Sequence, residues 1–518
     1  MTAAPEPNKK DAGAAMAPAT TMGSAEELED PLLPRKAVAF SVASEIKELA
    51  GLTLGFFISS VSWVIMKSTD TALLGHVGTR YLDASALSDL YTQSTGVFIQ
   101  GRVLGIFVSQ AFGAGNFALA GAWLQVSLVV LSCVSLPVVA AWSCTGLALG
   151  AFGVKSASLK ADAAYYAWVL MACIPARVGF SQLTQFFSAQ KLTRPSYTTA
   201  PVAMVLNLVL GLVLVLGVPF LGFKGYGFKA CPAVTSAVEF FQLCLLVYLF
   251  CYRERLMDAC TPTQGWRDWS MVTYDRCATY AKLYVPAALS IASDFWRVAA
   301  IGAVAATLSK DDLGVFNASY RIMWITLTFI GSLGGAISTK LAIRLGADDA
   351  PGAKRGVLVG LALALGVLLA LAVVVFTIPR SLGKIFTDDP KLLDTFEHIR
   401  LPLATTVFFM NSAVLFERIP MAMGRTRAVF VMGVLGSWAG QVPGVILCVK
   451  YWKRDLMAVY TGVSLGYALL TLLLGGLVLS TDFAKYAKEA LDRSEVTGAG
   501  GSTTINSSAD DGDDDEAA

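Results

Sequence analysis

The sequence has few charged residues and few histidines for its length. Of its 518 residues, 15% are Asp, Glu, Lys or Arg and 55% are hydrophobic, whereas a soluble globular chain carries about 25% charged residues. The two histidines, His76 and His398, cannot build a His-rich metal site. The net charge of +2 argues against a nucleic-acid partner. The low share of charged residues and the high share of hydrophobic residues favour a polytopic membrane protein.

No enzyme motif is present in the sequence. It lacks a Walker A sequence, a GxSxG elbow and an HExxH zinc motif. Its nine cysteines form no CxxC pair, and most of them lie in apolar runs, which is typical of small buried hydrophobic residues. We therefore expect no enzymatic activity, no cofactor and no metal. The energy source for any transport would be an ion gradient.

Three polar segments divide the chain. Residues 1–45 are rich in Ala, Pro, Glu and Lys and lack a signal-peptide core, which predicts a disordered cytosolic tail. Residues 481–518 become Gly/Ser-rich and then acidic (DDGDDDE), which predicts a second disordered tail. Residues 252–280 predict a cytosolic connector in the middle of the chain.

Apolar segments fill the rest of the chain, and twelve of them are long enough to cross a bilayer, whose core takes about 20 helical residues. They run over 50–75, 88–112, 122–153, 161–189, 196–218, 230–251, 281–308, 312–339, 356–388, 396–423, 428–450 and 456–480. We predict an all-α membrane protein whose twelve transmembrane helices form two six-helix lobes, 46–251 and 281–480.

The two predicted lobes share a weak internal repeat with an offset of 233 residues. The matched positions are Gly113-Ala114 with Gly346-Ala347, Ala189 with Ala422, Thr193-Arg194 with Thr426-Arg427, and Gly211 with Gly444. Since each lobe has an even number of spans, the repeats would be parallel, related by an axis along the membrane normal.

Lysine and arginine placement predicts the orientation. Arg35, Lys36 and Lys47 precede the first span, and Arg80 follows it. By the positive-inside rule, both termini are then cytosolic. No address motif distinguishes a plasma membrane from a vacuolar-type membrane.

Two pairs of oppositely charged residues lie inside the first and the seventh predicted spans. The apolar stretch 283–308 carries Asp294 and Arg297 near its middle, and the first span carries Lys67 and Asp70. A charge at the bilayer centre costs about 2.5–3.5 kcal/mol on insertion scales, so such residues face a cavity or a partner. Two interpretations stay open for each pair: an ion-coupling site built on Asp294 and Asp70, or an ion pair that fixes helix packing.

Other polar residues recur at helical spacing inside the spans. They predict a bundle interior with access to water, although interhelical hydrogen bonding is an equal alternative for the Ser and Thr members. The residues predicted to line a substrate cavity are Arg297, Asn317, Tyr320, Arg321, Trp324, Arg177, Thr184, Asn207 and Glu417.

Five stretches of the sequence resemble the multidrug and toxic compound extrusion (MATE) family, in particular its eukaryotic, plant- or algal-like members. They are DTALLGHVG (70–78), SQAFGAGN (109–116), FFSAQKLTRPSY (186–197), FLGFKGYGFKACPAV (220–234) and KLYVPAALSIASDFW (282–296). The resemblance covers roughly 50–480. It implies two lobes around a V-shaped cavity, with alternating access driven by proton or sodium entry.

The resemblance also assigns two acids. The family's seventh-helix acid falls on Asp294, and its first-helix acid, where present, falls on Asp70. Two departures concern this site: the seventh-helix acid is often Glu in eukaryotic members, and Arg297 one turn later is not expected. Together with the other arginines inside spans (Arg102, Arg177 and Arg321), Arg297 favours an anionic substrate such as a carboxylate.

The favoured function is a monomeric secondary antiporter, in contact with membrane lipids, that exports small organic molecules in exchange for protons. The substrates would be organic cations, secondary metabolites or carboxylates. The alternatives are a Na⁺-coupled exporter, a lipid-linked precursor flippase of the same superfamily, and a membrane-embedded enzyme or receptor. A flippase would need a larger and strongly basic cavity and often fourteen spans, whereas twelve are predicted. The lack of a catalytic cluster argues against the enzyme, and cysteine accessibility mapping would distinguish a solvent-lined cavity from a closed receptor bundle.

Overall fold

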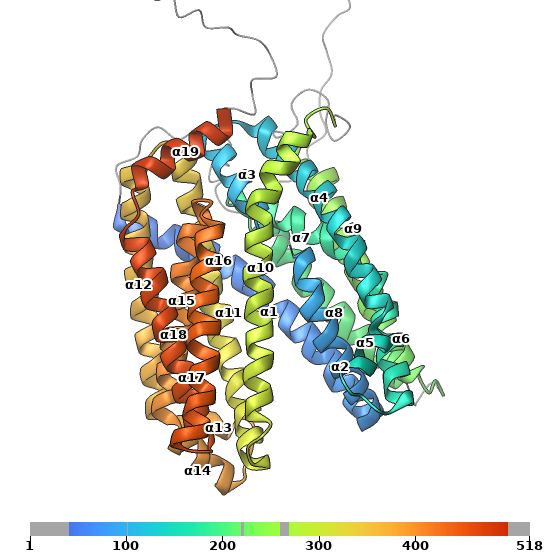
Figure 1. Ribbon diagram of the computed structural model, residues 1–518. Coiled ribbons are helices and arrows are strands. Elements are labelled where there is room, and N and C mark those ends of the chain that lie inside the picture. The colour runs from blue at the N-terminus through green and yellow to red at the C-terminus, as the bar shows by residue number, and fades with distance from the viewer. Residues whose placement is uncertain (1–40, 101, 219–221, 259–268, 496–518) are drawn as a thin grey trace, which may run out of the picture. The chain divides into compact units, whose positions relative to one another are not determined.

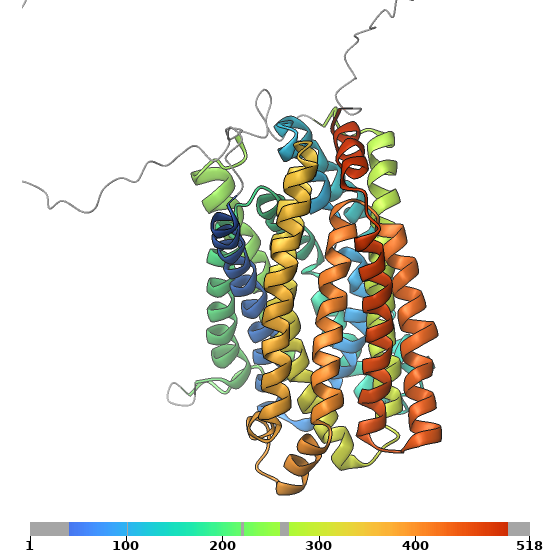
Figure 2. The same cartoon turned by 90° about the vertical axis from the view of Figure 1, so that its left-hand side faces the viewer.

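A computed structural model describes residues 41–100, 102–218, 222–258 and 269–495. Within these ranges the named elements are helical, and one β-bridge joins Val218 to Phe223. Long helices run side by side in both views of the chain (Figures 1 and 2). The described residues belong to one contact-defined unit.

The first half of the chain supplies the helices of the first six spans. They are α1 (Val42–Val77), α2 (Thr79–Gly96), η1 (Val97–Ile99), α3 (Leu104–Gly113), α4 (Phe117–Ser143), α5 (Thr145–Ala151), α6 (Ala157–Met171), α7 (Ile174–Ala189), α8 (Arg194–Gly211), η2 (Leu212–Leu216), η4 (Gly227–Lys229), α9 (Ala230–Leu246) and η5 (Val247–Arg253).

The second half supplies the remaining spans and a C-terminal helix. Its elements are α10 (Tyr274–Ala305), α11 (Lys310–Gly346), α12 (Ala350–Thr377), α13 (Pro379–Gly383), α14 (Pro390–His398), α15 (Arg400–Ala422), α16 (Thr426–Val434), η8 (Leu435–Gln441), α17 (Val442–Leu447), η9 (Cys448–Trp452), α18 (Leu456–Leu479) and α19 (Phe483–Glu495).

Twelve membrane spans result when each bent helix pair is counted as one span. Ten helical stretches in the described residues are long and apolar enough to cross a membrane. The α6–α7 pair, bent by 51°, and the α14–α15 pair, bent by 60°, bring the number to twelve. Pro175 near the start of α7 has no amide hydrogen to continue the α6 ladder, which accounts for that break. The predicted fold class is confirmed.

Helix ends repeat at the predicted offset of 233. Helix α3 ends at Gly113 and α11 at Gly346, while α7 ends at Ala189 and α15 at Ala422. The next helix in each half, α4 and α12, is capped in the same way by the residue just before it. The Asn116 side chain accepts a hydrogen bond from the amide of Leu119, and Asp349 accepts one from Gly352. Because 116 and 349 differ by 233, the duplication extends to hydrogen bonding.

Left-handed backbone conformations repeat at the same offset. Gly115 and Asp348 have φ of 73° and 55°, and Lys191 and Gly424 have φ of 65° and 85°. Non-glycine residues seldom adopt this region. Two shared turns of this kind at one offset are strong evidence that the halves are structural copies.

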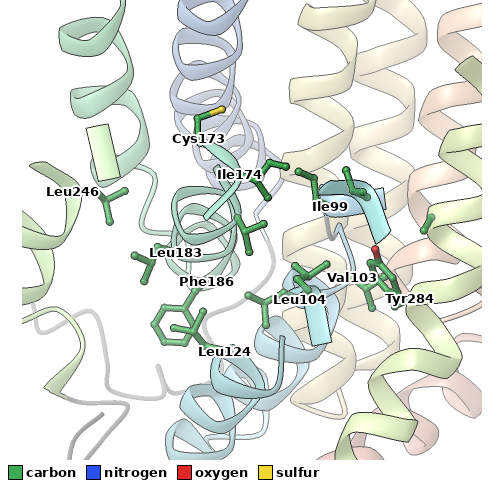
Figure 3. Close-up of a cluster of buried hydrophobic side chains, with 14 of the residues drawn as sticks. Ile99, Val103, Leu104, Leu124, Cys173, Ile174, Leu183, Phe186, Leu246 and Tyr284 are labelled. Carbon is green, nitrogen blue, oxygen red and sulfur yellow. The ribbon is translucent and has the colours of Figure 1, made fainter. Parts of the chain in front are cut away.

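The starts of α1 and α10 pack against the opposite half. Leu49 and Leu52 of α1 are buried in a cluster formed mainly by α11, α12 and α15. Tyr280 and Tyr284 of α10 are buried in the core of the first half, and Figure 3 shows Tyr284 beside Val103. The beginning of the first helix of each repeat therefore reaches into the opposite half, while the rest of α1 and α10 packs in its own half, on α8 and α16 respectively.

The predicted disordered tail 481–518 is wrong for its first part. Residues Phe483–Glu495 form α19, in which Ala487 and Ala490 are fully buried. Helix α19 packs on α3, α11 and α12. Small apolar residues at helical spacing form one apolar face of α19, and this face is buried. The acidic stretch and residues 496–518 as a whole lie outside the described residues.

The other predicted polar segments are also shorter than expected. Helix α1 begins at Val42, inside the predicted tail 1–45, and α10 begins at Tyr274, inside the predicted connector 252–280. Residues 1–40 and 259–268 lie outside the described residues.

Candidate functional site

The first-half candidate, Asp70, is held by three helices. Its side chain is buried, with the residue 3% exposed. One carboxylate oxygen accepts a hydrogen bond from Asn207 Nδ2 on α8, and the other accepts one from Thr235 Oγ1 on α9, each at 2.9 Å. Lys67 Nζ lies 4.0 Å from Oδ2, so the predicted i, i+3 pair is present.

An acceptor at this site has no partner. Asn207 Oδ1 is buried and receives no hydrogen bond from the described residues. The two Asp70 oxygens each accept one hydrogen bond, from the Asn207 amide nitrogen and from the Thr235 hydroxyl, and the Asn207 carbonyl oxygen has no partner among the described residues. Such a set can hold a proton or a small hard cation. The sequence identified Asp70 and Asn207 but missed Thr235, which has no signal beyond being polar in a span.

A second charged pair of the first half joins α7 to α9. Arg177 donates from Nη2 to Glu239 Oε1 at 2.6 Å and from Nε to Oε2 at 3.0 Å. The arginine side chain is 28% exposed and the glutamate 8%. This bidentate geometry compensates both charges. Thr184, two turns along the same face of α7, donates to the carbonyl of Ser181. A cavity-lining role for Arg177 and Thr184 remains a prediction.

The second-half candidate pairs an accessible acid with an anchored arginine. On α10, Arg297 Nη2 lies 3.2 Å from Asp294 Oδ1. Arg297 is 4% exposed and donates to Ser437 Oγ at 3.2 Å and to Tyr467 Oη at 3.0 Å. The Asp294 side chain is 42% exposed. The arginine is therefore fixed from three sides, whereas the acid is only partly covered by the protein.

A second acid belongs to the same cluster. Glu417 on α15 is half-buried, and the charges of Asp294, Arg418, Arg102 and Arg297 act on it. Two carboxylates and three guanidinium groups from different elements thus share one electrostatic neighbourhood. The predicted residue Glu417 is brought together with Asp294.

Arg102 enters this cluster from a break in the second span. Between η1 and α3 the helix is interrupted, and its free carbonyl groups accept hydrogen bonds from side chains of neighbouring helices. Tyr284 donates to the Phe98 carbonyl, and Ser181 donates to that of Gln100 at 3.2 Å. Arg102 itself is exposed, and its Nη2 donates to Gln100 Oε1 at 3.4 Å.

The predicted polar stripe on α11 lies near the same cluster. Tyr320 interacts electrostatically with Arg297 and Asp294, and its ring contacts that of Trp324 with 6.2 Å between centroids. Asn317, Arg321 and Trp324 are exposed. The structure therefore brings Tyr320 to the second-half site and leaves the other three accessible beside it.

An ion network between α1 and α11 was not predicted. Lys340 Nζ lies 3.0 Å from Glu45 Oε2 and 2.8 Å from Glu48 Oε2. Arg344 donates to both oxygens of Glu45. Glu45 and Lys340 are both buried. Only helix packing brings these residues together, so the sequence alone gave no sign of the contact.

Two equivalent halves of six spans, each with ionisable residues buried within the bundle, define an integral multi-pass membrane protein of the transporter class. The chain belongs to the MatE family, whose sequence profile matches residues 56–213 and 286–446. The resemblance seen in the sequence is thereby confirmed.

Individual relatives are distant. The chain is similar to Multidrug and toxin extrusion protein 1 of Xenopus tropicalis, with 24% identity over 378 residues, or 72% of this chain and 63% of the frog protein. It is 21% identical over 459 residues to Protein DETOXIFICATION 14 of Arabidopsis thaliana, covering 87% and 91% of the two chains.

Solved structures share the fold. The crystal structure of the eukaryotic MATE transporter AtDTX14 matches with a TM-score of 0.78 and 20% identity, covering 88% of this chain and 99% of that one. An outward-facing multidrug resistance MATE family transporter matches with a TM-score of 0.75 and 16% identity, covering 86% and 97%.

Proposed function

We propose that the protein is a secondary active antiporter that exports small organic molecules in exchange for protons by alternating access. The observation that carries the proposal is the contrast between Asp294 and Arg297: an accessible acid inside an apolar span, beside a base fixed by two further partners. The names of the frog and Arabidopsis relatives, which refer to extrusion and detoxification, support export.

Proton uptake at Asp294 would change the charge of the whole cluster. The neutral acid no longer offsets Arg297, and the second acid, Glu417, then faces the arginines alone. Proton and substrate compete for the same carboxylates when the substrate is a cation, because either one neutralises them. For an organic cation, proton binding at these carboxylates therefore displaces the substrate, and this competition couples the two fluxes. A carboxylate substrate would instead be held by arginines, of which Arg102 is exposed.

A sodium-coupled exporter is the second candidate, supported by the first-half site. The buried Asp70 carboxylate accepts hydrogen bonds from Asn207 Nδ2 and Thr235 Oγ1, and Asn207 Oδ1 has an unused lone pair among the described residues. A hard cation prefers such oxygen ligands. In either case we propose that Asp70 and Asp294 are the ion-coupling residues, one in each half.

The arrangement in the membrane is part of the proposal. We infer a monomer with lobes near 46–251 and 281–480, and with both termini cytosolic because the basic residues Arg35, Lys36 and Lys47 precede the first span. We propose that the protein resides in a plasma membrane or in a vacuolar-type membrane.

Efflux from proteoliposomes tests the proposal. Vesicles are loaded with tetraethylammonium or with citrate, and efflux is followed with and without an imposed pH gradient or Na⁺ gradient. In Asp294→Asn and Glu417→Gln we expect pH-driven efflux to fall to the rate of passive exchange. Asp492→Asn, which removes an exposed acid of α19, is the control and should transport normally. Undiminished pH-driven efflux in both site variants would remove these acids from the coupling.

A further inference from the structure

A cavity separate from the two acid sites lies where α10, the turn between α15 and α16, and α19 meet. Its volume is about 410 Å³. In Figure 1, α19 lies at the same end of the bundle as the beginning of α10. Three cations line it, Lys282, Arg425 and Arg493, against one acid, Glu489. The lining therefore carries an excess of positive charge.

Arg425 is fixed in the wall but keeps donors available. Its Nη1 donates to the Leu477 carbonyl at 3.3 Å and to Thr481 Oγ1 at 3.0 Å, which satisfies acceptors at the end of α18. The guanidinium lies over the ring of Tyr486, with 5.2 Å to its centroid. Nε and Nη2 form no hydrogen bond with the described part of the chain. A planar, oriented guanidinium with unused donors suits a phosphate oxygen.

Arg493 of α19 is a second guanidinium in the lining of the cavity. It donates from Nη2 to the Met423 carbonyl at 3.1 Å and from Nε to the Glu489 carbonyl at 3.0 Å. It packs on Gly424, where a Cβ would overlap Nη1 and where φ is 85°. Burial lowers the pKa of the Arg493 guanidinium, and the charge of Glu489 opposes this change. An additional anion would stabilise the buried charge further.

Lys282 completes the set from α10. It is exposed, and it forms no ion pair with the described residues. Apolar side chains of Leu283 and Met423 line the cavity beside it. Two membrane-spanning stretches, Tyr274–Ala305 and Thr426–Trp452, begin at this place, so the cavity lies at the end of the spans. Lipid headgroups occupy that level of a bilayer.

We propose that this cavity binds the phosphate of an anionic phospholipid headgroup. Basic pockets between transmembrane helices at the cytosolic surface hold such headgroups, and the apolar wall would contact the first atoms of the acyl region. The bound phosphate bridges α10, α16 and α19. It therefore holds the C-terminal helix against the bundle and stabilises this end of the protein.

Lipid retention by the full-length protein tests the site. Protein in micelles is mixed with phosphatidylglycerol or phosphatidylcholine, and the bound lipid is counted by native mass spectrometry. We expect selective retention of phosphatidylglycerol. Lys282→Gln should weaken it about fivefold, the effect of one charge near the surface, and Glu489→Gln should strengthen it. Lys488→Gln is the matched control, because Lys488 is an exposed lysine of α19 that does not line the cavity.

Arg425→Gln gives a second readout if the protein stays folded, since Arg425 also caps α18. Equal effects of Lys282→Gln and Lys488→Gln would show general charge attraction and overturn the proposal. So would full displacement of the lipid by inorganic phosphate, which would identify a soluble anion as the ligand. Lipid binding that occurs only after residues 496–518 are removed would assign the cavity to that acidic segment instead.

Discussion

Gly113 of α3 and Gly346 of α11 lie against each other's helix backbone. A Cβ on Gly113 would overlap the carbonyl oxygen of Ile343, and a Cβ on Gly346 would overlap that of Gln110. The four residues form two pairs with one offset of 233. The crossing of α3 and α11 therefore lies on the axis that relates the two halves, and the close approach there requires glycine on both sides.

The first prediction concerns this crossing. Gly346→Ala should destabilise the protein by about 1–3 kcal/mol, as overpacking of a tight contact does. Gly331→Ala is the control, because Gly331 lies on the same helix with open space around it, and it should be neutral or slightly stabilising. Thermal unfolding in detergent measures both. Equal unfolding temperatures for the two variants would show that the crossing tolerates a side chain.

The second prediction concerns the buried acid of α1. Asp70→Asn keeps the shape of the side chain but removes the charge that Asn207 and Thr235 hydrogen-bond. We expect ion-driven efflux to fall to the passive rate while the protein remains folded. Asp83→Asn, at an exposed position of α2, should leave transport unchanged. Normal coupling in Asp70→Asn would assign the carboxylate a packing role only.

The third prediction separates a structural role of Arg177 from a cavity-lining role. Glu239→Gln leaves the Arg177 guanidinium without its counter-charge and should cost about 3–5 kcal/mol of stability. The double variant Arg177→Met, Glu239→Leu removes both charges and should recover most of that loss. If the recovered protein also transports normally, Arg177 acts in packing. If it is stable but inactive, Arg177 contributes to the cavity as predicted from the sequence.

The fourth prediction concerns the ion network between α1 and α11. Lys340→Met removes contacts of 3.0 and 2.8 Å to two glutamates. Hydrogen bonds to charged groups contribute about 1.5–3 kcal/mol, so the end of the bundle that they hold together should open more often. Labelling of a cysteine introduced at Leu341 would report the opening. Lys354→Met, at an exposed position of α12, should not change the labelling rate.

Features set by local periodicity could be predicted from the sequence. Span length follows from apolar runs, and all twelve predicted spans correspond to helices or bent helix pairs. The offset of 233 was visible in glycines and alanines, and it recurs in caps and turns such as Asn116 and Asp349. The pairs Lys67–Asp70 and Asp294–Arg297 were predictable because i, i+3 neighbours on a helix are close in any tertiary context.

Features that depend on how helices face one another could not be predicted. Thr235 joins Asp70 only because α9 is rotated toward α1, and Lys340 meets Glu45 across nearly three hundred residues of sequence. Helix α19 was overlooked because its buried face consists of alanines such as Ala487, which carry little hydrophobic signal. Likewise, the sequence did not single out Glu239 among several acids as the residue that forms the bidentate pair with Arg177.

Helix α1 connects the ion network at Glu45 with the buried site at Asp70. Glu45, near its start, is fixed to α11 in the other half, and Asp70, near its end, is fixed to α8 and α9 in its own half. Twenty-five residues of continuous helix separate them, a length of about 37 Å at 1.5 Å per residue. A rigid rod anchored at both tips turns a small tilt at one leaflet into a displacement at the other. If Asp70 binds and releases the coupling ion as proposed, α1 would transmit that change to the Glu45 contacts near the other end of the helix.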